Sequence, residues 1–410
     1  MGAGANARVQ SKVVAPASAR RVVLSVHRWV GLAMALFLLI EGITGAMLAF
    51  RGPLTRYFDP ALFSTAPTPN ARRLDLATLI EIAEQREPRG EFHWFLPMES
   101  DVALLYLVPK SDRSQAGTFA PTYLALDPWT GREVRRMDGG LYSRSGLLAN
   151  VMPFVYDLHK TLALGSTGVW LLAITALLWT LDSLWAVYLT FPRGMTRFWS
   201  RWKPSWLIKW RARWPRVNYD AHRASSLWLW LPLLLFAWSS VALLDNLSVY
   251  DVTMRGLLGA PNYPSMAALS GPTRPHATPR LDWHQALARG EMLGEAIARR
   301  ESFTLAEANS IWFDERSHQY SIRFRTSRRF PRDQDLIFYF DGDTGVPGPV
   351  IATTDGNANA TATAWLVAFH MVGDPFDYTA YRAFVCLLGT LLAAISVTGV
   401  VIWLAKRRTR

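Results

Sequence analysis

Four of the eight histidines lie next to long apolar segments, and they repeat along the chain. His27 and His222 each precede an arginine where an apolar segment begins, whereas His159 and His370 each lie shortly before one. Neutral imidazole is a common metal ligand, and an ionisable group beside a bilayer is a functional candidate by default. The four histidines occupy matching positions in the two halves of the chain, and each half has one near each face of the membrane. We therefore predict that they are metal ligands.

The histidines form two predicted pairs. The inner pair, His27 and His222, should lie at the cytoplasmic ends of two spans, and the outer pair, His159 and His370, at the opposite face. Two imidazoles that face each other between helices suit the axial positions of haem iron, whereas zinc would need further ligands. We therefore predict two non-covalent haem b groups that form an electron path between the faces. The cations expected to bind haem propionates are Arg28 and Arg223 at the inner pair, and Lys160 and Arg382 at the outer pair.

Composition excludes several other kinds of site. The 410-residue chain has one cysteine, Cys386, which rules out a disulfide scaffold, a thiolate metal site and haem attached through a C-x-x-C-H motif. The net charge of +12 is concentrated beside the apolar segments, so it indicates membrane topology and not a nucleic-acid partner. A disordered chain is excluded because half of the residues are hydrophobic.

Four apolar segments are long enough to cross a bilayer, and we predict an α-helical four-span bundle. The spans are expected at 22–50, 158–191, 222–246 and 367–405, the last with its histidine segment in front. The first apolar run is too long for a cleaved signal peptide, so we expect it to remain as an anchor.

Lysine and arginine predict the orientation of the spans. They are abundant in the tail 1–21, the loop 192–221 and the tail 406–410, so these regions should be cytoplasmic. The connections 51–157 and 247–366 carry nearly equal numbers of basic and acidic residues and should lie on the other side. In a bacterium the spans would cross the inner membrane, and the two connections would form periplasmic α+β domains.

The predicted cytoplasmic loop also carries tryptophans at helical spacing. They are Trp199, Trp202, Trp206, Trp210 and Trp214. Arginine and lysine occupy the other faces, which predicts a helix over 198–214 that lies in the membrane interface, with a break or start at Pro204. Docking of a cytoplasmic partner is the alternative interpretation.

The chain reads as one unit used twice, in the order span, exported domain, span. Each exported domain contains an alternating strand that ends in Asp-x-x-Thr-Gly, at 127–131 and at 341–345. We expect a hairpin turn at each, with the aspartate as the cap and the glycine at positive φ. A helix should precede each hairpin, over 74–85 and 281–299. We interpret the turns as structural and not catalytic.

Other ionisable residues are weaker candidates. Glu41 is a lone acid in the first predicted span; it could carry protons or contact a quinol, but a helix-packing role is favoured. We interpret the remaining histidines as surface or structural residues: His93, His276, His284 and His318. We assign no catalytic residue.

The chain resembles the PepSY-associated transmembrane family, also called iron-regulated membrane proteins, over nearly its whole length. The resemblance rests on His27-Arg28 with Gly31 after it, the two hairpins, His159, His370 and the arrangement of spans. Members look like inner-membrane ferric-siderophore reductases with two b-type haems and PepSY-like exported domains. The resemblance therefore implies that electrons cross to the periplasm and reduce siderophore-bound Fe(III), which releases the iron as Fe(II).

The sequence departs from the family pattern in two respects. Some relatives carry flavodoxin-like and flavin-reductase domains, but this sequence has no glycine-rich nucleotide loop, so we expect an electron donor in trans, either quinol or a cytoplasmic reductase. The segment after His222 lacks a counterpart of Gly31.

Two other functions are the alternatives. One is a non-redox protein that senses envelope ligands or binds peptidases. The other is a siderophore permease, but the spans contain few polar residues, which argues against transport.

Overall fold

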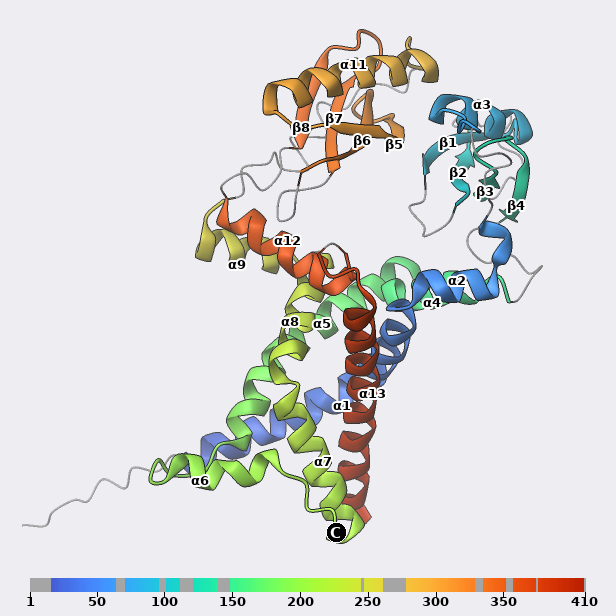
Figure 1. The fold of residues 1–410 in the computed structure, drawn as a ribbon. Coiled ribbons are helices and arrows are strands. Elements are labelled where there is room, and N and C mark those ends of the chain that lie inside the picture. The colour runs from blue at the N-terminus through green and yellow to red at the C-terminus, as the bar shows by residue number, and fades with distance from the viewer. Residues whose placement is uncertain are drawn as a thin grey trace, which may run out of the picture. The chain divides into compact units, whose positions relative to one another are not determined.

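The computed structural model divides into two compact units (Figure 1). The helical unit comprises 1–43, 170–241 and 387–410, and the mixed unit comprises 44–169 and 242–386. The structure describes residues 16–63, 71–95, 101–110, 121–138, 148–244, 247–260, 278–328, 335–351, 357–373 and 375–408.

Three described helices are long and apolar enough to cross a membrane: α1 (Pro16–Leu48), α5 (Gly165–Thr190) and α13 (Thr379–Arg408). The predicted third span is instead a pair of helices, α7 (Trp214–Trp228) and α8 (Trp230–Leu243), bent by 68°. Pro232 explains the break, because its ring would clash with the carbonyl of residue 228 in a continuous helix. The described chain therefore has three candidate spans, or four if the bent pair crosses as one.

The helical unit has a compact apolar core. Its buried members come from α1, α8 and α13: Met34, Leu38, Leu233, Leu388 and Leu392. At one point α1 and α13 approach so closely that a Cβ built on Gly42 would lie 2.5 Å from the carbonyl oxygen of Gly389. Small residues commonly allow such close approach between helices in membranes.

The predicted interfacial helix over 198–214 is wrong beyond residue 206. The loop forms only α6 (Phe198–Trp202) and the 3-10 turn η2 (Lys203–Trp206), and Leu207 is extended. Pro204 ends the α-helical pattern after one turn, since it cannot supply a backbone N–H. Trp206 then packs against Trp228 of α7, with ring centroids 5.1 Å apart.

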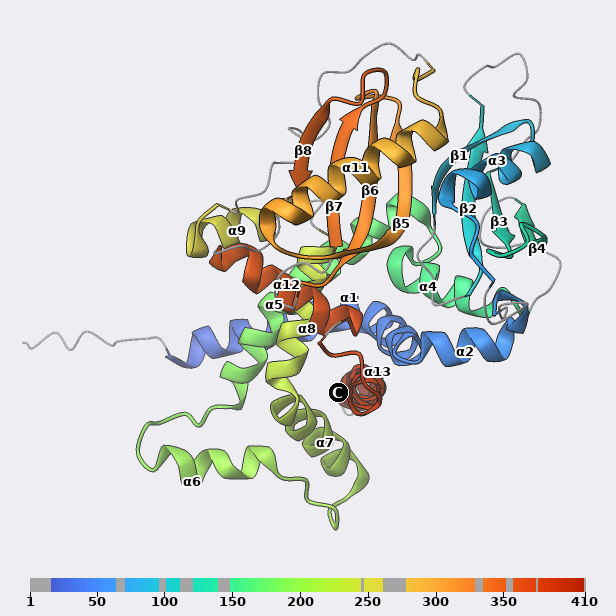
Figure 2. The ribbon, with the colours of Figure 1, turned by 45° about the horizontal axis from the view of Figure 1, so that its top comes forward.

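The mixed unit contains two α+β domains of the same design, each with a helix and a four-stranded antiparallel sheet (Figure 2). The first domain comprises α2 (Arg51–Phe58), η1 (Pro60–Leu62), α3 (Leu76–Arg86), β1 (Gly90–Phe95), β2 (Ala103–Pro109), β3 (Thr122–Leu126) and β4 (Glu133–Asp138). The second comprises α9 (Val249–Leu258), α11 (Trp283–Glu301), β5 (Leu305–Asp314), β6 (Gln319–Thr326), β7 (Asp335–Asp341) and β8 (Pro347–Ile351). Each domain is followed by a short helix, α4 (Val151–Thr161) or α12 (Ala358–Met371).

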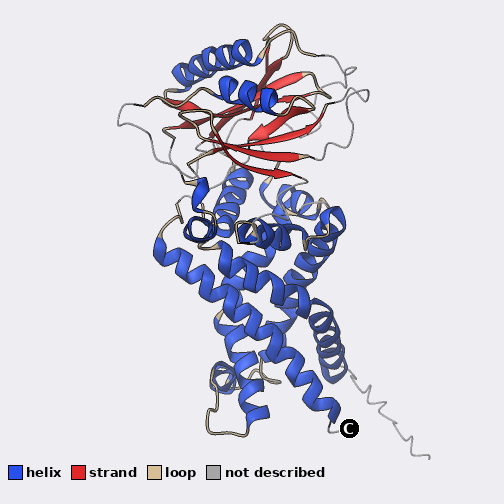
Figure 3. Cartoon of the chain, turned by 90° about the vertical axis from the view of Figure 1, so that its right-hand side faces the viewer, coloured by secondary structure: helices blue, strands red, loops and turns tan. Residues whose placement is uncertain are grey.

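The two α+β domains share one hydrophobic core. Edge strand β1 lies beside edge strand β5, and α3 lies beside α11. Both helices cover the same side of the strands (Figure 3). Phe92 of β1 packs against Trp283 of α11 with ring centroids 5.4 Å apart, and the same cluster contains the fully buried Ile80 and Phe340. The helices predicted before each hairpin are confirmed as α3 and α11.

Both predicted hairpin turns are confirmed. Gly131 and Gly345 have φ of +66° and +65°, a backbone conformation that L-residues rarely adopt. Asp127 Oδ1 accepts hydrogen bonds from the N–H groups of the second and third following residues at 3.0 and 2.9 Å. Asp341 Oδ1 accepts the equivalent bonds at 3.1 and 2.9 Å. The aspartates therefore cap the turns.

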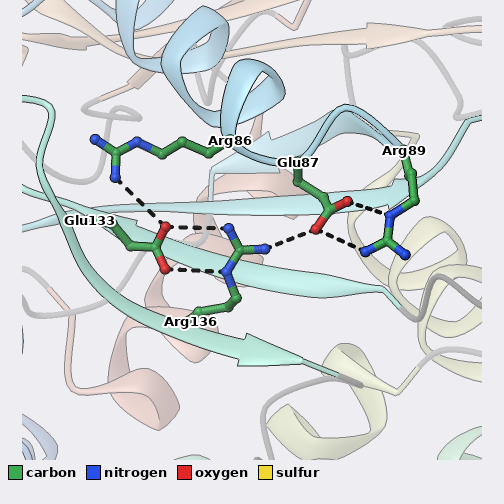
Figure 4. Close-up of polar contacts among 5 residues, drawn as sticks. All are labelled: Arg86, Glu87, Arg89, Glu133 and Arg136. Atoms are coloured by element: carbon green, nitrogen blue, oxygen red, sulfur yellow. Dashed lines mark hydrogen bonds and ion pairs between the residues drawn. The ribbon is translucent and has the colours of Figure 1, made fainter.

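A chain of ion pairs ties the end of α3 to strand β4 in the first domain (Figure 4). Glu87 accepts hydrogen bonds from Arg89 Nε and Arg136 Nη1, both at 2.9 Å. Glu133 contacts Arg136 at 3.2 Å and Arg86 at 3.7 Å. The Arg89 hydrogen bond is the largest influence on Glu87, and with Arg136 it holds the pKa of this carboxyl below its usual value despite the opposing effect of burial.

Acid should weaken this network. A carboxyl whose pKa is lower in the folded than in the unfolded protein stabilises the fold at pH values above its unfolded pKa, which is about 4.3 for glutamate. This stabilisation is lost as the pH falls through the folded-state pKa. We expect Glu87→Gln to lower the free energy of unfolding at pH 7 by about 1 kcal/mol or less, which appears as a lower Tm. The variant should then lose less stability than the wild type between about pH 5 and pH 3. Thermal unfolding across that pH range measures both effects, with exposed Glu307→Gln as the control. Equal acid sensitivity in the wild type and Glu87→Gln would contradict the prediction.

Candidate functional site

The outer pair lies on two short helices that precede the long ones. His159 is near the end of α4 and His370 is near the end of α12. Leu162 and Val372, with φ of +53° and +54°, end these helices in the left-handed conformation. The expected spans 158–191 and 367–405 each joined a histidine to its span, whereas the structure separates them at these left-handed residues.

The geometry of the outer pair fits two ligands of one metal ion. The ring centroids of His159 and His370 are 6.4 Å apart, and the rings are inclined at 53°. With nitrogen about 2.0 Å from the metal, two imidazoles on opposite sides of it would have centroids roughly 6 Å apart. His159 Nδ1 is 2.9 Å from the Thr44 hydroxyl. A Cβ on Gly45 would lie 3.3 Å from His159 Cε1, so the ring packs directly on α1.

The inner pair comes from α1 and α7. His27 Nδ1 is 2.9 and 3.0 Å from the two carboxylate oxygens of Asp182 on α5. His222 Nδ1 is 3.0 Å from the carbonyl oxygen of Ile395 and 3.1 Å from the Thr398 hydroxyl, both on α13. Both predicted inner histidines therefore lie in the helical unit, His27 in contact with α5 and His222 in contact with α13.

Three of the four candidate ligands use Nδ1 in the same way. In His27, His159 and His222 this nitrogen contacts an oxygen on another helix. Such contacts orient a ligating histidine and leave Nε2 as the atom that can bind a metal. A glycine also lies against one ring of each pair, because a Cβ on Gly399 would be 3.2 Å from His222 Cε1.

Sequence reasoning missed the residues that orient the histidines. They are Thr44, Gly45, Asp182, Ile395, Thr398 and Gly399. Asp182 carried a usable signal, since it is the one acid in the predicted span 158–191 and acids within spans are commonly functional. The others are ordinary helix residues, and only helix packing reveals that they contact an imidazole.

One family model matches nearly the whole chain. The model of the PepSY-associated TM region matches residues 24–406. The chain belongs to this family. The match contains all four histidines of the two pairs, Asp182 and both hairpins, so it confirms the resemblance inferred from the sequence. A comparison with curated proteins finds no match.

Two of the predicted propionate-binding cations of this PepSY-associated TM protein have acidic partners within the chain. Arg223 Nη2 donates to Asp220 Oδ1 at 2.8 Å and to the carbonyl oxygen of Pro204 at 2.9 Å, which holds the loop at η2 against α7. Arg382 Nε donates to Asp377 at 2.9 Å. Both arginines therefore stabilise local structure.

The other two cations have fewer contacts. Arg28 is half-buried on α1, immediately after His27. Lys160 Nζ lies 5.9 Å from the ring centroid of Tyr156 on α4, and Arg51 of α2 lies 4.8 Å from the same ring. Arg51 is therefore another basic residue near the helix that carries His159, and it was not singled out from the sequence.

Three of the remaining histidines lie in the α+β domains. His318 is buried and contacts Asp343 at 3.0 Å, and His284 on α11 contacts Glu81 at 3.3 Å. His93 lies on β1, while His276 is outside the described residues. Within the part of the chain that the structure describes, no three or more His, Cys, Asp or Glu side chains are placed to hold a metal ion. Among these residues, each pair would thus supply two ligands.

Proposed function

We propose that this PepSY-associated TM protein is a di-haem oxidoreductase of the bacterial inner membrane that reduces siderophore-bound Fe(III) in the periplasm. The outer pair carries the proposal, because its ring separation of 6.4 Å suits two axial ligands of one iron. In this proposal the chain crosses the membrane four times, α7 and α8 together form the third span, and both termini lie in the cytoplasm.

The residues present fit haem better than a bare metal ion. Two imidazoles are enough for haem, since the macrocycle supplies the other four ligands, whereas a protein zinc site needs three or four side chains. Haem iron supplies one-electron oxidation and reduction. His27 with His222 and His159 with His370 would hold the two groups, and the apolar faces of the helices would exclude water from them.

The substrate chemistry follows from the need to release iron. Each ferric siderophore takes up one electron, and because siderophores bind Fe(II) weakly, the reduced metal dissociates. The electron comes from a donor in trans, either a quinol or a cytoplasmic reductase. A sensing or peptidase-binding protein, or a permease, would have no need of paired imidazoles with oriented Nδ1 atoms.

The test is a spectrum followed by a reaction. The full chain, expressed with adequate haem supply, should contain two low-spin b-type haems per chain in oxidised and dithionite-reduced spectra. Anaerobic addition of a ferric siderophore should then reoxidise the reduced protein. The same siderophore loaded with Ga(III), which is not reduced to a divalent ion, is the matched control and should leave the spectrum unchanged. A protein purified without haem, or one that ferric siderophores do not reoxidise, would refute the proposal.

A further inference from the structure

One histidine of the inner pair has a charged partner at Nδ1. His27 contacts the carboxylate of Asp182, whose side chain is 10% exposed. His222 contacts a carbonyl and a hydroxyl oxygen on α13. An anion therefore contacts the inner pair through His27.

A carboxylate behind a ligating imidazole changes what the ligand does. Donation of the Nδ1 hydrogen to an anion raises the basicity of the ring, so the other nitrogen becomes a stronger electron donor to a metal. Negative charge in a setting of low dielectric also favours the more positive oxidation state of a nearby iron. Both effects stabilise Fe(III) relative to Fe(II), and both lower the reduction potential.

We infer that Asp182 is a positioning residue that lowers the reduction potential of the inner site through its contact with His27. A lower potential makes the inner site a stronger donor of one electron to the outer site, and no further reactant is needed. This inference rests on the proposed function, because it requires haem at both pairs.

The experiment compares Asp182→Asn with the wild type in the full, haem-loaded chain. Asparagine keeps the size of the side chain and a hydrogen-bond acceptor but removes the charge. Spectroelectrochemical titration should show the midpoint potential of the inner site rising, so that the equilibrium between the two sites changes by about tenfold, or 59 mV for one electron. The potential of the outer site should stay unchanged. Thr44→Val is the matched control, since it removes a partner from His159 and should leave the potential of the inner site unchanged.

Assignment of the potentials and loss of haem need their own controls. The titration is repeated in a His370→Ala background, in which the inner site alone should be loaded. If Asp182→Asn does not retain the inner haem, Asp182→Glu decides. Recovery of haem with the wild-type potential at the inner site supports the inference, whereas a raised potential or continued loss overturns it. Haem-loaded Asp182→Asn with an unchanged potential at the inner site also overturns it and leaves the proposed function intact. Absence of haem from the wild type would instead refute the proposed function.

Discussion

Replacing His159 or His370 by alanine should reduce the haem content from two to one per chain. Each haem is expected to depend on two axial imidazoles from different helices, and in the outer pair these rings lie 6.4 Å apart. Loss of one ring leaves a single ligand on a non-covalent group, so we expect dissociation or conversion to a weakly held five-coordinate state. His27→Ala and His222→Ala should have the same effect on the inner site.

Haem counted per chain, together with the low-spin fraction of the spectrum, measures this loss. His284→Ala is a matched control, because His284 lies on the exposed face of α11 near Glu81 and outside both pairs. It should retain two haems. Two fully low-spin haems in both His159→Ala and His370→Ala would show that the outer pair is not a ligand pair.

Gly42→Ala should strongly destabilise the helical unit. The added Cβ would lie 2.5 Å from the Gly389 carbonyl oxygen and 2.9 Å from the Ala393 backbone nitrogen, so α1 and α13 would have to separate. Overpacking of this kind costs about 1–3 kcal/mol. It should outweigh the helix preference of alanine over glycine, which is about 1 kcal/mol in the opposite direction.

The comparison is Gly256→Ala on α9, where an added Cβ meets nothing within 4 Å. The two variants make the same change in a helix, so propensity alone would give them equal effects. Thermal unfolding in detergent, followed by tryptophan fluorescence, should show a clearly lower Tm for Gly42→Ala and an unchanged or higher Tm for Gly256→Ala. A Tm for Gly42→Ala that matches the wild type would mean that the crossing is not close-packed.

Local sequence signals predicted the parts of the fold that depend on few residues. Each hairpin turn follows from one aspartate and one glycine at fixed spacing, and both were predicted correctly. The repeat also paired His159 with His370, and their ring contact agrees with that pairing although more than 200 residues separate them. Internal duplication thus carried long-range information that propensity alone does not contain.

Features that depend on packing or on competing local effects could not be read in the same way. The tryptophan spacing predicted one helix over 198–214 with a break or start at Pro204; the break is confirmed, but the helix does not resume before α7 begins at Trp214. Pro232 marks the break between α7 and α8 in the sequence, but the angle of 68° depends on how the two helices pack. The contacts of Thr44 and Thr398 with imidazoles exist only after helices from distant parts of the chain have packed.

The common core of the two α+β domains has a consequence for the topology of the chain. Phe92 and Trp283 belong to different halves of the duplication, yet they pack in the same cluster. The chain segment between the two domains therefore forms a loop in the topological sense, because apolar contacts between the domains hold its two ends together. Closing such a long loop costs little more entropy than closing a shorter one. The chain has a single cysteine and so cannot form a disulfide within itself; the shared core links the two halves by apolar contact instead. A half produced alone would expose the apolar residues that the other half covers.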